Sequence, residues 1–353
     1  MHAELLFNGP VSGRDHRIEM AQLPGGGRIA CAVTGSGPYL LVVPGWLSHL
    51  ELGWALPAER MFYESLSSGR SLVRFDRPGC GLSDPYDGPR SMELELATVA
   101  AVVDELGMAT FDLLGWSLGA AVAARWAADR PDTTSRLVLY GGWANGAAIG
   151  DDDSRQHILG LLAAHWGFGS DLLTEVFAPD ADAGTRAALA HYQRAASSAE
   201  TAVALLRLAY ELDVRAALPQ VQAPTLVLHR REDRAAPLAQ GRALAAGIPG
   251  AELIELDGRS HLPAIGDADA VVAAARRFLG LPALRRAVPT GLTPRQTEVA
   301  ALVADGLTNR ELAERLTITE RSAESHVERI RLRLGFRSRA QIAAWYVATG
   351  PHN

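Results

Sequence analysis

The chain has 353 residues, about twice the length of a typical domain, so two domains are expected. With 48% hydrophobic and 21% charged residues, its composition is that of a globular protein, not a disordered or fibrous one. The longest apolar run, residues 39–47, falls far short of the roughly 18 residues of a membrane-spanning helix. The first residues lack the basic start and apolar core of a secretory signal, and two cysteines are too few for a disulfide framework. We therefore expect a cytoplasmic protein with no membrane partner.

The net charge of −6 hides an uneven distribution along the chain. Residues 283–353 hold 11 Arg against 7 acidic residues, whereas the preceding 282 residues hold 23 Arg against 33 acidic residues. A basic tail on an acidic body indicates an anionic partner for the tail alone.

Between residues 28 and 279, short apolar runs alternate with Ala-rich helical stretches. Most of these runs are bounded by Gly, Pro or Asp, as strands buried on both faces are, and the alternation predicts a doubly wound α/β fold. The predicted strands are residues 29–33, 40–43, 71–75, 111–114, 137–140, 225–229 and 252–256. Residues 143–222 contain no convincing strand, and we expect three or four helices there, including 153–164 and 200–212, that form a cap over the sheet.

A short stretch with Pro and Gly, residues 283–291, is predicted to link two domains. Residues 1–282 would form the α/β domain, and residues 292–353 a small all-α domain with four helices. Gly306 and Gly335 stand where two of these helices would end. Capping boxes are predicted for Thr293 with Gln296, Thr308 with Glu311, and Ser338 with Gln341.

Residues 115–119 read Gly-Trp-Ser-Leu-Gly, a G-x-S-x-G pattern between a predicted strand and a helical run. This strand–turn–helix setting is typical of a nucleophile elbow. A serine nucleophile needs a base and an orienting acid, which follow on this fold in the order Ser, Asp or Glu, His. We assign Ser117 as nucleophile, His261 as general base and Asp233 as the acid that orients it, with Glu232 as the competing acid.

An oxyanion hole needs two backbone N–H donors aimed at the developing negative charge. Leu118, directly after the nucleophile, supplies one of them. The second is assigned to Trp46, which follows Pro44 and Gly45 at the end of a predicted strand. The alternative for Trp46 is a packing role, which is compatible with donation from its backbone.

Residues 25–282 resemble the α/β-hydrolase superfamily. The resemblance is carried by residues 42–46 (VVPGW), 74–84 (RFDRPGCGLSD), the elbow, and 228–237 together with His261. It implies a serine hydrolase acting on an ester or lactone, since the dehalogenase and epoxide-hydrolase relatives have Asp at the elbow. Two departures, Arg230 where the family often has Gly and Pro44 where it usually has His, are expected to reshape the pocket.

Several aromatic and histidine side chains of the predicted cap either line a ligand pocket or pack the cap helices. They are His165, Trp166, His191, Tyr192 and Tyr210. Because the sequence has no metal-ligand cluster and no Gly-rich phosphate loop, we predict no cofactor and no metal site.

Residues 292–349 resemble the LuxR-type (GerE-like) helix-turn-helix domain, through residues 292–299 (LTPRQTEV), 306–313 (GLTNRELA), 326–327 (HV) and 334–340 (LGFRSRA). Residues 309–316 would be the scaffold helix and 320–334 the recognition helix, which enters the major groove of double-stranded DNA. The recognition helix would bury Ala323, Val327, Ile330 and Leu334. The predicted DNA-binding residues are Asn309, Arg310, Arg321, Ser322, Glu324, Ser325, Glu328, Arg329, Arg333, Arg337 and Arg339, and Arg331 is a further candidate for phosphate contact.

Glu324 departs from the family, many members of which have Lys at this position. A carboxylate in the groove can accept a hydrogen bond from cytosine N4, and it weakens non-specific binding. We therefore hypothesise strict sequence readout with weak background binding. Trp345 and Tyr346 either form the contact of a homodimer that binds paired half-sites, or pack in the domain's own core.

Three functions follow from these patterns. The leading one is a transcription regulator whose hydrolase domain senses a small ester- or lactone-like ligand and can hydrolyse it. The second is a serine esterase or lactonase that the helix-turn-helix tail only localises. The third is a hydrolase-fold receptor that binds its ligand without turnover.

Overall fold

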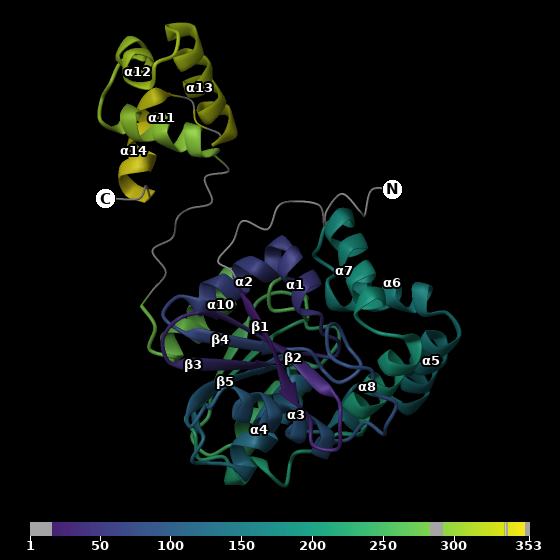
Figure 1. Cartoon of the computed structure of the whole chain (residues 1–353). Helices are drawn as coiled ribbons and strands as arrows, with labels where there is room; N and C mark the ends of the chain where they lie inside the picture. The colour runs from purple at the N-terminus through teal and green to yellow at the C-terminus, as the bar shows by residue number, and fades with distance from the viewer. Residues whose placement is uncertain (1–15, 283–291, 335, 337, 350–353) are drawn as a thin grey trace. The chain divides into compact units, whose positions relative to one another are not determined.

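The structure, a computed structural model, describes residues 16–282, 292–334, 336 and 338–349. The chain divides into two compact units, Met1–Ala283 and Leu284–Asn353 (Figure 1). The first contains the predicted α/β fold, and the second contains the predicted helices of the tail.

The first unit is built on an eight-stranded sheet with the order β1-β2-β4-β3-β5-β6-β7-β8. The β1–β2 and β2–β4 pairs are antiparallel, and the other neighbours are parallel. The strands are β1 (Arg17–Gln22), β2 (Arg28–Gly35), β3 (Tyr39–Val43), β4 (Ser71–Phe75), β5 (Phe111–Trp116), β6 (Thr134–Tyr140), β7 (Thr225–Arg230) and β8 (Glu252–Leu256). The predicted fold class is thus confirmed, and each of the seven predicted strands corresponds to one of β2–β8.

Strand β1 was not predicted from the sequence. It lies at one edge of the sheet, its sequence RIEMAQ holds no apolar run, and most of its residues are at least partly exposed. An edge strand that is paired on one side only needs no such run.

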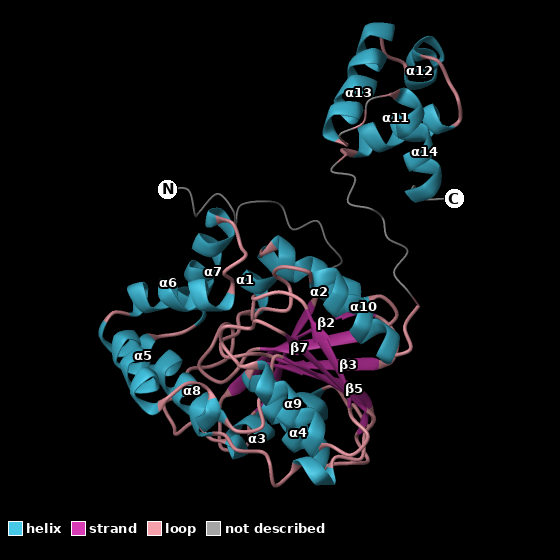
Figure 2. Ribbon diagram, turned by 180° about the vertical axis from the view of Figure 1, so that it is seen from behind, coloured by secondary structure: helices cyan, strands magenta, loops and turns pink. Residues whose placement is uncertain are grey.

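The two faces of the sheet are covered by different helices, as the alternation of side chains along each strand requires. In β3, Leu41 and Val43 belong to the core on one face, and Leu40 and Val42 to the core on the other. The first face packs against α3 (Met92–Glu105), α4 (Leu118–Asp129) and α9 (Leu238–Gly247). The second packs against α2 (Pro57–Ser67) and α10 (Ala268–Phe278) (Figure 2).

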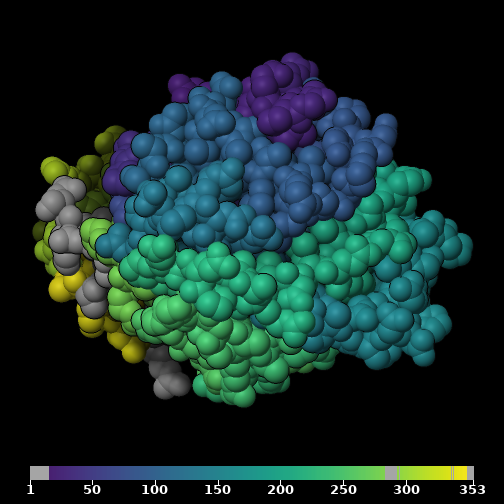
Figure 3. Space-filling model, turned by 90° about the horizontal axis from the view of Figure 1, so that it is seen from below, coloured from purple at the N-terminus to yellow at the C-terminus, as the bar shows by residue number. Residues whose placement is uncertain are grey.

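Four helices stand between β6 and β7, where the sequence predicted a helical cap. They are α5 (Asp152–Ala164), α6 (Trp166–Phe177), α7 (Ala183–Ala196) and α8 (Ala199–Glu211). Side chains of Asp151, Asp182 and Ser198 cap α5, α7 and α8 at their N-termini, which fixes where these helices begin. In the space-filling view the segment of α5 and α6, in teal, forms a projecting end of the first unit (Figure 3). One more short helix, α1 (Leu50–Ala55), follows β3.

The second unit consists of α11 (Pro294–Ala304), α12 (Asn309–Leu316), α13 (Glu320–Arg333) and α14 (Arg339–Thr349). All three predicted capping boxes form, including the pair in which the Ser338 N–H donates to Gln341 and the Gln341 N–H donates to Ser338. Helix α13 ends at Arg333, one residue earlier than predicted. Of the predicted buried face, Ala323 and Ile330 are buried, and Val327 and Leu334 are partly buried.

Gly306 follows α11 at a φ of 87°, as expected for a residue that ends a helix, whereas Gly335 lies outside the described residues. Among the described helices, none has the length and apolar character needed to cross a membrane.

The close contact between α4 and β3 allows a test of the fold. A Cβ atom added at Gly119 would lie 2.3 Å from the Pro44 and Val43 carbonyl oxygens, so Gly119→Ala should lower the free energy of unfolding by about 2 kcal/mol or more. Gly160, in α5, has no atom near the corresponding position, so Gly160→Ala should raise it by about 0.5 kcal/mol. Urea unfolding of both variants measures the difference. Equal effects of the two substitutions would contradict the packing described.

Candidate active site

Ser117 stands on a strained turn between β5 and α4. Its φ of 55° and ψ of −128° are sparsely populated for a residue with a side chain. A Cβ at Gly115 would lie 2.3 Å from the Gly119 carbonyl oxygen, so glycine at both positions lets the helix start directly over the strand. The turn is held by the Ser117 N–H, which donates to the Tyr140 carbonyl at 2.9 Å. This is the geometry of a nucleophile elbow.

A chain of two hydrogen bonds connects Ser117 to a carboxylate through a histidine. His261 Nε2 lies 2.8 Å from Ser117 Oγ, and His261 Nδ1 lies 2.8 Å from Asp233 Oδ2. Because the carboxylate can only accept at Nδ1, the neutral ring carries its proton there and leaves Nε2 free to accept the Ser117 hydroxyl proton. All three side chains are buried.

Asp233 is fixed as an anion by its surroundings. Its second oxygen, Oδ1, accepts from the Ala235 and Ala236 N–H groups at 2.9 and 3.1 Å. Burial disfavours the charged form, but the interactions of the carboxylate with His261, His229 and the Ala236 N–H together outweigh it and hold the pKa of Asp233 below its ordinary value. Glu232, the competing acid, is exposed, and its backbone N–H donates to Gly258. The geometry therefore favours Asp233.

Trp46 and Leu118, assigned to the oxyanion hole, have available backbone donors. Within the described part of the chain, neither N–H donates to another protein group. The Trp46 indole is engaged separately, since its Nε1 donates to the Ala202 carbonyl of α8 at 3.0 Å. Trp46 therefore has a packed side chain and a backbone N–H without a partner among the described residues, and this arrangement is compatible with both roles considered for it.

The buried Arg77 sets the orientation of the loop that carries Trp46. Its Nε donates to the Gly45 carbonyl at 2.8 Å and its Nη2 to the Pro44 carbonyl at 2.6 Å, and the guanidinium also pairs with Glu95. Across a trans peptide bond the carbonyl and the next N–H point in opposite directions. Holding the Gly45 carbonyl therefore turns the Trp46 N–H away from Arg77.

Arg230, a departure from the family pattern, supports the loop that carries His261. Its Nη1 donates to the Ser260 carbonyl at 2.8 Å and to the Leu262 carbonyl at 3.3 Å, one on each side of His261. It lines neither of the pockets beside Ser117. Any effect of Arg230 on the shape of the pockets would therefore act through the loop that carries His261.

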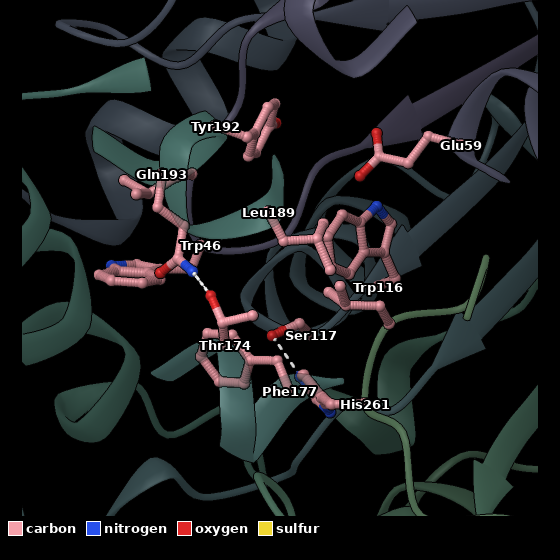
Figure 4. Close-up of a pocket in the computed structure, with 12 residues that line it drawn as sticks. Trp46, Glu59, Trp116, Ser117, Thr174, Phe177, Leu189, Tyr192, Gln193 and His261 are labelled. Carbon is pink, nitrogen blue, oxygen red and sulfur yellow. Dashed lines mark hydrogen bonds between the residues drawn. The ribbon is translucent and has the colours of Figure 1, made fainter. Parts of the chain in front are cut away.

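Two pockets meet at Ser117 and His261, with Trp46 and Phe177 shared between them. The first, called here the Glu59 pocket, is lined by Trp46, Leu47, Glu59, Trp116, Ser117, Thr174, Phe177, Leu189, Tyr192, Gln193, His261 and Leu262 (Figure 4). The second, the Tyr210 pocket, is lined mainly by cap residues, which include Arg155 and Tyr210. Arg234, outside the cap, also lines it. A substrate with two arms on either side of a carbonyl would place one arm in each pocket.

The cap contributes to both pockets through only some of the predicted side chains. Tyr192 lines the first pocket and Tyr210 the second, whereas Trp166 packs edge-on against Trp46 with ring centres 5.9 Å apart. His165 and His191 line neither pocket. The sequence did not single out Glu59, because it is one of many acidic residues on predicted helices and only the fold brings it to Ser117.

In the second unit, the predicted DNA-binding residues divide into exposed and engaged groups. The exposed ones are Arg310, Arg321, Glu324, Glu328, Arg329 and Arg333. Glu328 is held by Arg331, whose Nε lies 2.9 Å from its carboxylate, and the Ser322 hydroxyl bonds that of Thr319 at the start of α13. Ser325 is partly buried.

Asn309 and Arg339 bind each other at 2.7 Å and so tie α12 to α14. Arg337 lies outside the described residues. Trp345 and Tyr346 pack against the core of the unit, as in the second of the two interpretations of this pair.

Comparison with protein families assigns both parts of the chain. The model of the alpha/beta hydrolase family matches residues 40–275, about two thirds of the chain. The chain belongs to the alpha/beta hydrolase family. Its residues 290–346 match the model of bacterial regulatory proteins of the luxR family, so this hydrolase-fold chain also carries a helix-turn-helix domain of the DNA-binding type. Both resemblances predicted from the sequence are confirmed.

Individual relatives match the hydrolase part. A pimeloyl-[acyl-carrier protein] methyl ester esterase from Xanthomonas campestris pv. campestris is 29% identical over 262 residues, which cover 70% of this chain and 97% of the esterase. The polyketide synthase ThaQ from Burkholderia thailandensis is 27% identical over 274 residues, 74% of this chain but only 13% of ThaQ. The enol-lactonase from Burkholderia xenovorans LB400 has the same fold, with a TM-score of 0.63 and 24% identity over 74% of this chain and 100% of the lactonase.

The choice between the two acids leads to a direct test. Asp233→Asn should lower kcat/KM for p-nitrophenyl acetate by about 1,000-fold or more, because an amide cannot stabilise the imidazolium or hold the ring in the required tautomer. Glu232→Gln removes a charge from the neighbouring residue and should leave kcat/KM within about twofold. A larger loss in the Glu232 variant would reassign the acid.

Arg230 and its neighbour Arg231 form a second matched pair. Arg230→Met should lower kcat for the same ester by about 10-fold, because His261 loses the support of the carbonyls on both sides. Arg231 is exposed and pairs with Glu255, so Arg231→Met should leave kcat unchanged. If both variants kept full activity, the His261 loop would not depend on Arg230.

Proposed function

We propose that this protein is a transcription regulator whose hydrolase domain binds, senses and hydrolyses a small ester- or lactone-like ligand. The observation that carries the proposal is the hydrogen-bonded series Ser117, His261 and Asp233 at the junction of two pockets. A receptor without turnover would need only the pockets and not this arrangement.

The reaction proposed follows from the positions of the three groups. Ser117 Oγ attacks the ligand carbonyl while its proton passes to His261 Nε2, and the carbonyl oxygen gains negative charge that the Trp46 and Leu118 N–H groups stabilise. As the C–O bond to the leaving alcohol breaks, His261 returns the proton to that oxygen. Water then attacks the acyl-serine with His261 again as base, which releases the acid and restores Ser117. Each step uses groups supplied by the chain and water.

The relatives support an ester as the substrate class. The Xanthomonas protein is named as a methyl ester esterase and the Burkholderia xenovorans protein as an enol-lactonase, and both chemistries attack an acyl carbon that bears oxygen. Ser117 at the elbow fits this class.

The helix-turn-helix domain supplies the second half of the proposal. Exposed Arg310, Arg321 and Arg329 would contact phosphates of double-stranded DNA while α13 enters the major groove. If two copies of the chain bind paired half-sites, ligand binding could change the spacing between their two helix-turn-helix domains. If the tail only localised an esterase, DNA affinity would not respond to the ligand.

This coupling is tested with Ser117→Ala, which keeps the pockets but does not consume the ligand. With a DNA site obtained by selection, adding an ester or lactone that the wild type hydrolyses should change the DNA Kd by about fivefold or more in fluorescence anisotropy. A Kd that stays constant while the same ligand demonstrably binds would favour the localised esterase.

The role proposed for Glu324 is tested by binding-site selection. Glu324→Ala should strengthen binding to unrelated DNA by about threefold and relax the base preference at one position of the half-site, because the carboxylate no longer accepts from cytosine N4. Glu298→Ala removes the same charge from an exposed position of α11 and should leave the base preference unchanged. An unaltered preference in the Glu324 variant would refute the readout role.

A further inference from the structure

The end of the Glu59 pocket opposite Ser117 is polar, although the walls between are largely apolar. Leu47, Phe177, Leu189 and Leu262 line the pocket. In Figure 4 the Glu59 carboxylate and the indole nitrogen of Trp116 lie at the same end, away from the Ser117–His261 hydrogen bond. A ligand arm that runs from Ser117 past these carbon side chains would therefore end at two polar groups. The other polar side chains that line the pocket are Thr174, Tyr192 and Gln193, and the Gln193 amide donates to the Thr174 hydroxyl at 2.6 Å.

The Trp116 indole is a buried donor without a partner. The side chain is 9% exposed, and its Nε1 makes no hydrogen bond among the described residues. The Tyr63 hydroxyl is close to Nε1, but not in hydrogen-bonding geometry. A buried N–H is normally paired, because leaving it unpaired loses the hydrogen bond it would make in water.

Glu59 is an acceptor that also lacks a partner. Within the described residues its carboxylate makes no hydrogen bond or ion pair, and the backbone of Gly53 gives it room, since a Cβ there would lie 2.9 Å from Oε2. Burial raises the pKa of Glu59 to about 7, with Arg74 opposing the shift. Arg74 makes no ion pair with Glu59 among the described residues; it is stacked between the Trp54 and Tyr63 rings at 4.7 and 4.9 Å, and its Nε and Nη2 have no hydrogen-bond partner there.

We propose that Glu59 and Trp116 form a subsite that recognises a neutral hydrogen-bonding group, a hydroxyl or a carboxamide, at the end of one arm of the substrate. Such a group accepts from Trp116 Nε1 and donates to the Glu59 carboxylate at the same time. A plain alkyl end leaves both protein groups unpaired, and an ammonium cannot accept from the indole. A carboxylate is repelled by Glu59 in its ionised form, which predominates above pH 7. This subsite rests on the proposed function, because it names the substrate class of the same cleft.

The test compares substrates that differ only at the end of one arm. One series is p-nitrophenyl esters of acids of three to six carbons with methyl, hydroxyl, carboxamide, ammonium or carboxylate ends; a second is acetate esters of alcohols with the same ends. In one of the series, the wild type should favour the hydroxyl or carboxamide end over methyl by about 10-fold in kcat/KM at the best length. A ratio near one at every length in both series, or a preference for ammonium or carboxylate, would overturn the proposal.

The ratio of kcat/KM for hydroxyl-ended to methyl-ended substrates, taken within each variant, separates recognition of the end group from a general loss of activity. Trp116→Phe and Glu59→Met should each reduce the hydroxyl-to-methyl ratio to about one, whereas Glu59→Gln keeps an acceptor and should retain most of it. Glu64→Gln, on the same helix but outside the pocket, should keep the full ratio. A ratio that survives both Trp116→Phe and Glu59→Met would contradict the assignment.

Binding to Ser117→Ala distinguishes failure of this subsite from failure of the proposed function. If wild type hydrolyses no ester but calorimetry shows tighter binding of hydroxyl-ended than methyl-ended esters by Ser117→Ala, the subsite stands and hydrolysis is wrong. If the wild type hydrolyses esters with all five end groups equally well, hydrolysis stands and the subsite is wrong. Absence of both turnover and preferential binding would refute the two together.

Discussion

The strained turn at Ser117 is the constraint on which the active site depends. A serine at a φ of 55° persists only because the surrounding backbone leaves it no other position. Gly115 and Gly119 permit β5, α4 and β3 to approach so closely that a single methyl group at either position would clash at 2.3 Å. The same approach places the Leu118 N–H next to Ser117 and brings Trp46 to the pocket that Ser117 lines, so the proposed nucleophile and both proposed oxyanion donors follow from one backbone arrangement.

Two buried arginines hold the loops that carry Trp46 and His261. Arg77 donates to the two carbonyls that precede Trp46, and Arg230 donates to the carbonyls on either side of His261. Each guanidinium donates in fixed directions to backbone carbonyls, so each holds its loop in one conformation, and Arg77 is itself held by its ion pair with Glu95. The cap also contacts Trp46, because the Trp46 indole donates to the Ala202 carbonyl of α8. A ligand that shifts α8 would therefore act directly on Trp46.

Much of this arrangement could be predicted from the sequence, for identifiable reasons. Most of strands β2–β8 were predictable because buried strands are apolar runs with breakers at their ends. The three residues that the structure joins by hydrogen bonds, Ser117, Asp233 and His261, could be singled out because they follow three of the predicted strands. Edge strand β1 lacks such a run. Glu59 and Trp116 come together only in the folded chain. The hydrogen bond between Asn309 and Arg339 joins residues 30 positions apart, so the sequence pattern predicted DNA contacts for them but not their contact with each other.

The most direct test of an activated nucleophile is reaction of the full chain with a serine-directed fluorophosphonate, read by intact mass. If His261 draws the Ser117 proton as the hydrogen bonds indicate, the wild type should gain one adduct and Ser117→Ala none, with both proteins folded and binding DNA equally. No adduct on folded, DNA-binding wild type, or an equal adduct on Ser117→Ala, would contradict the account.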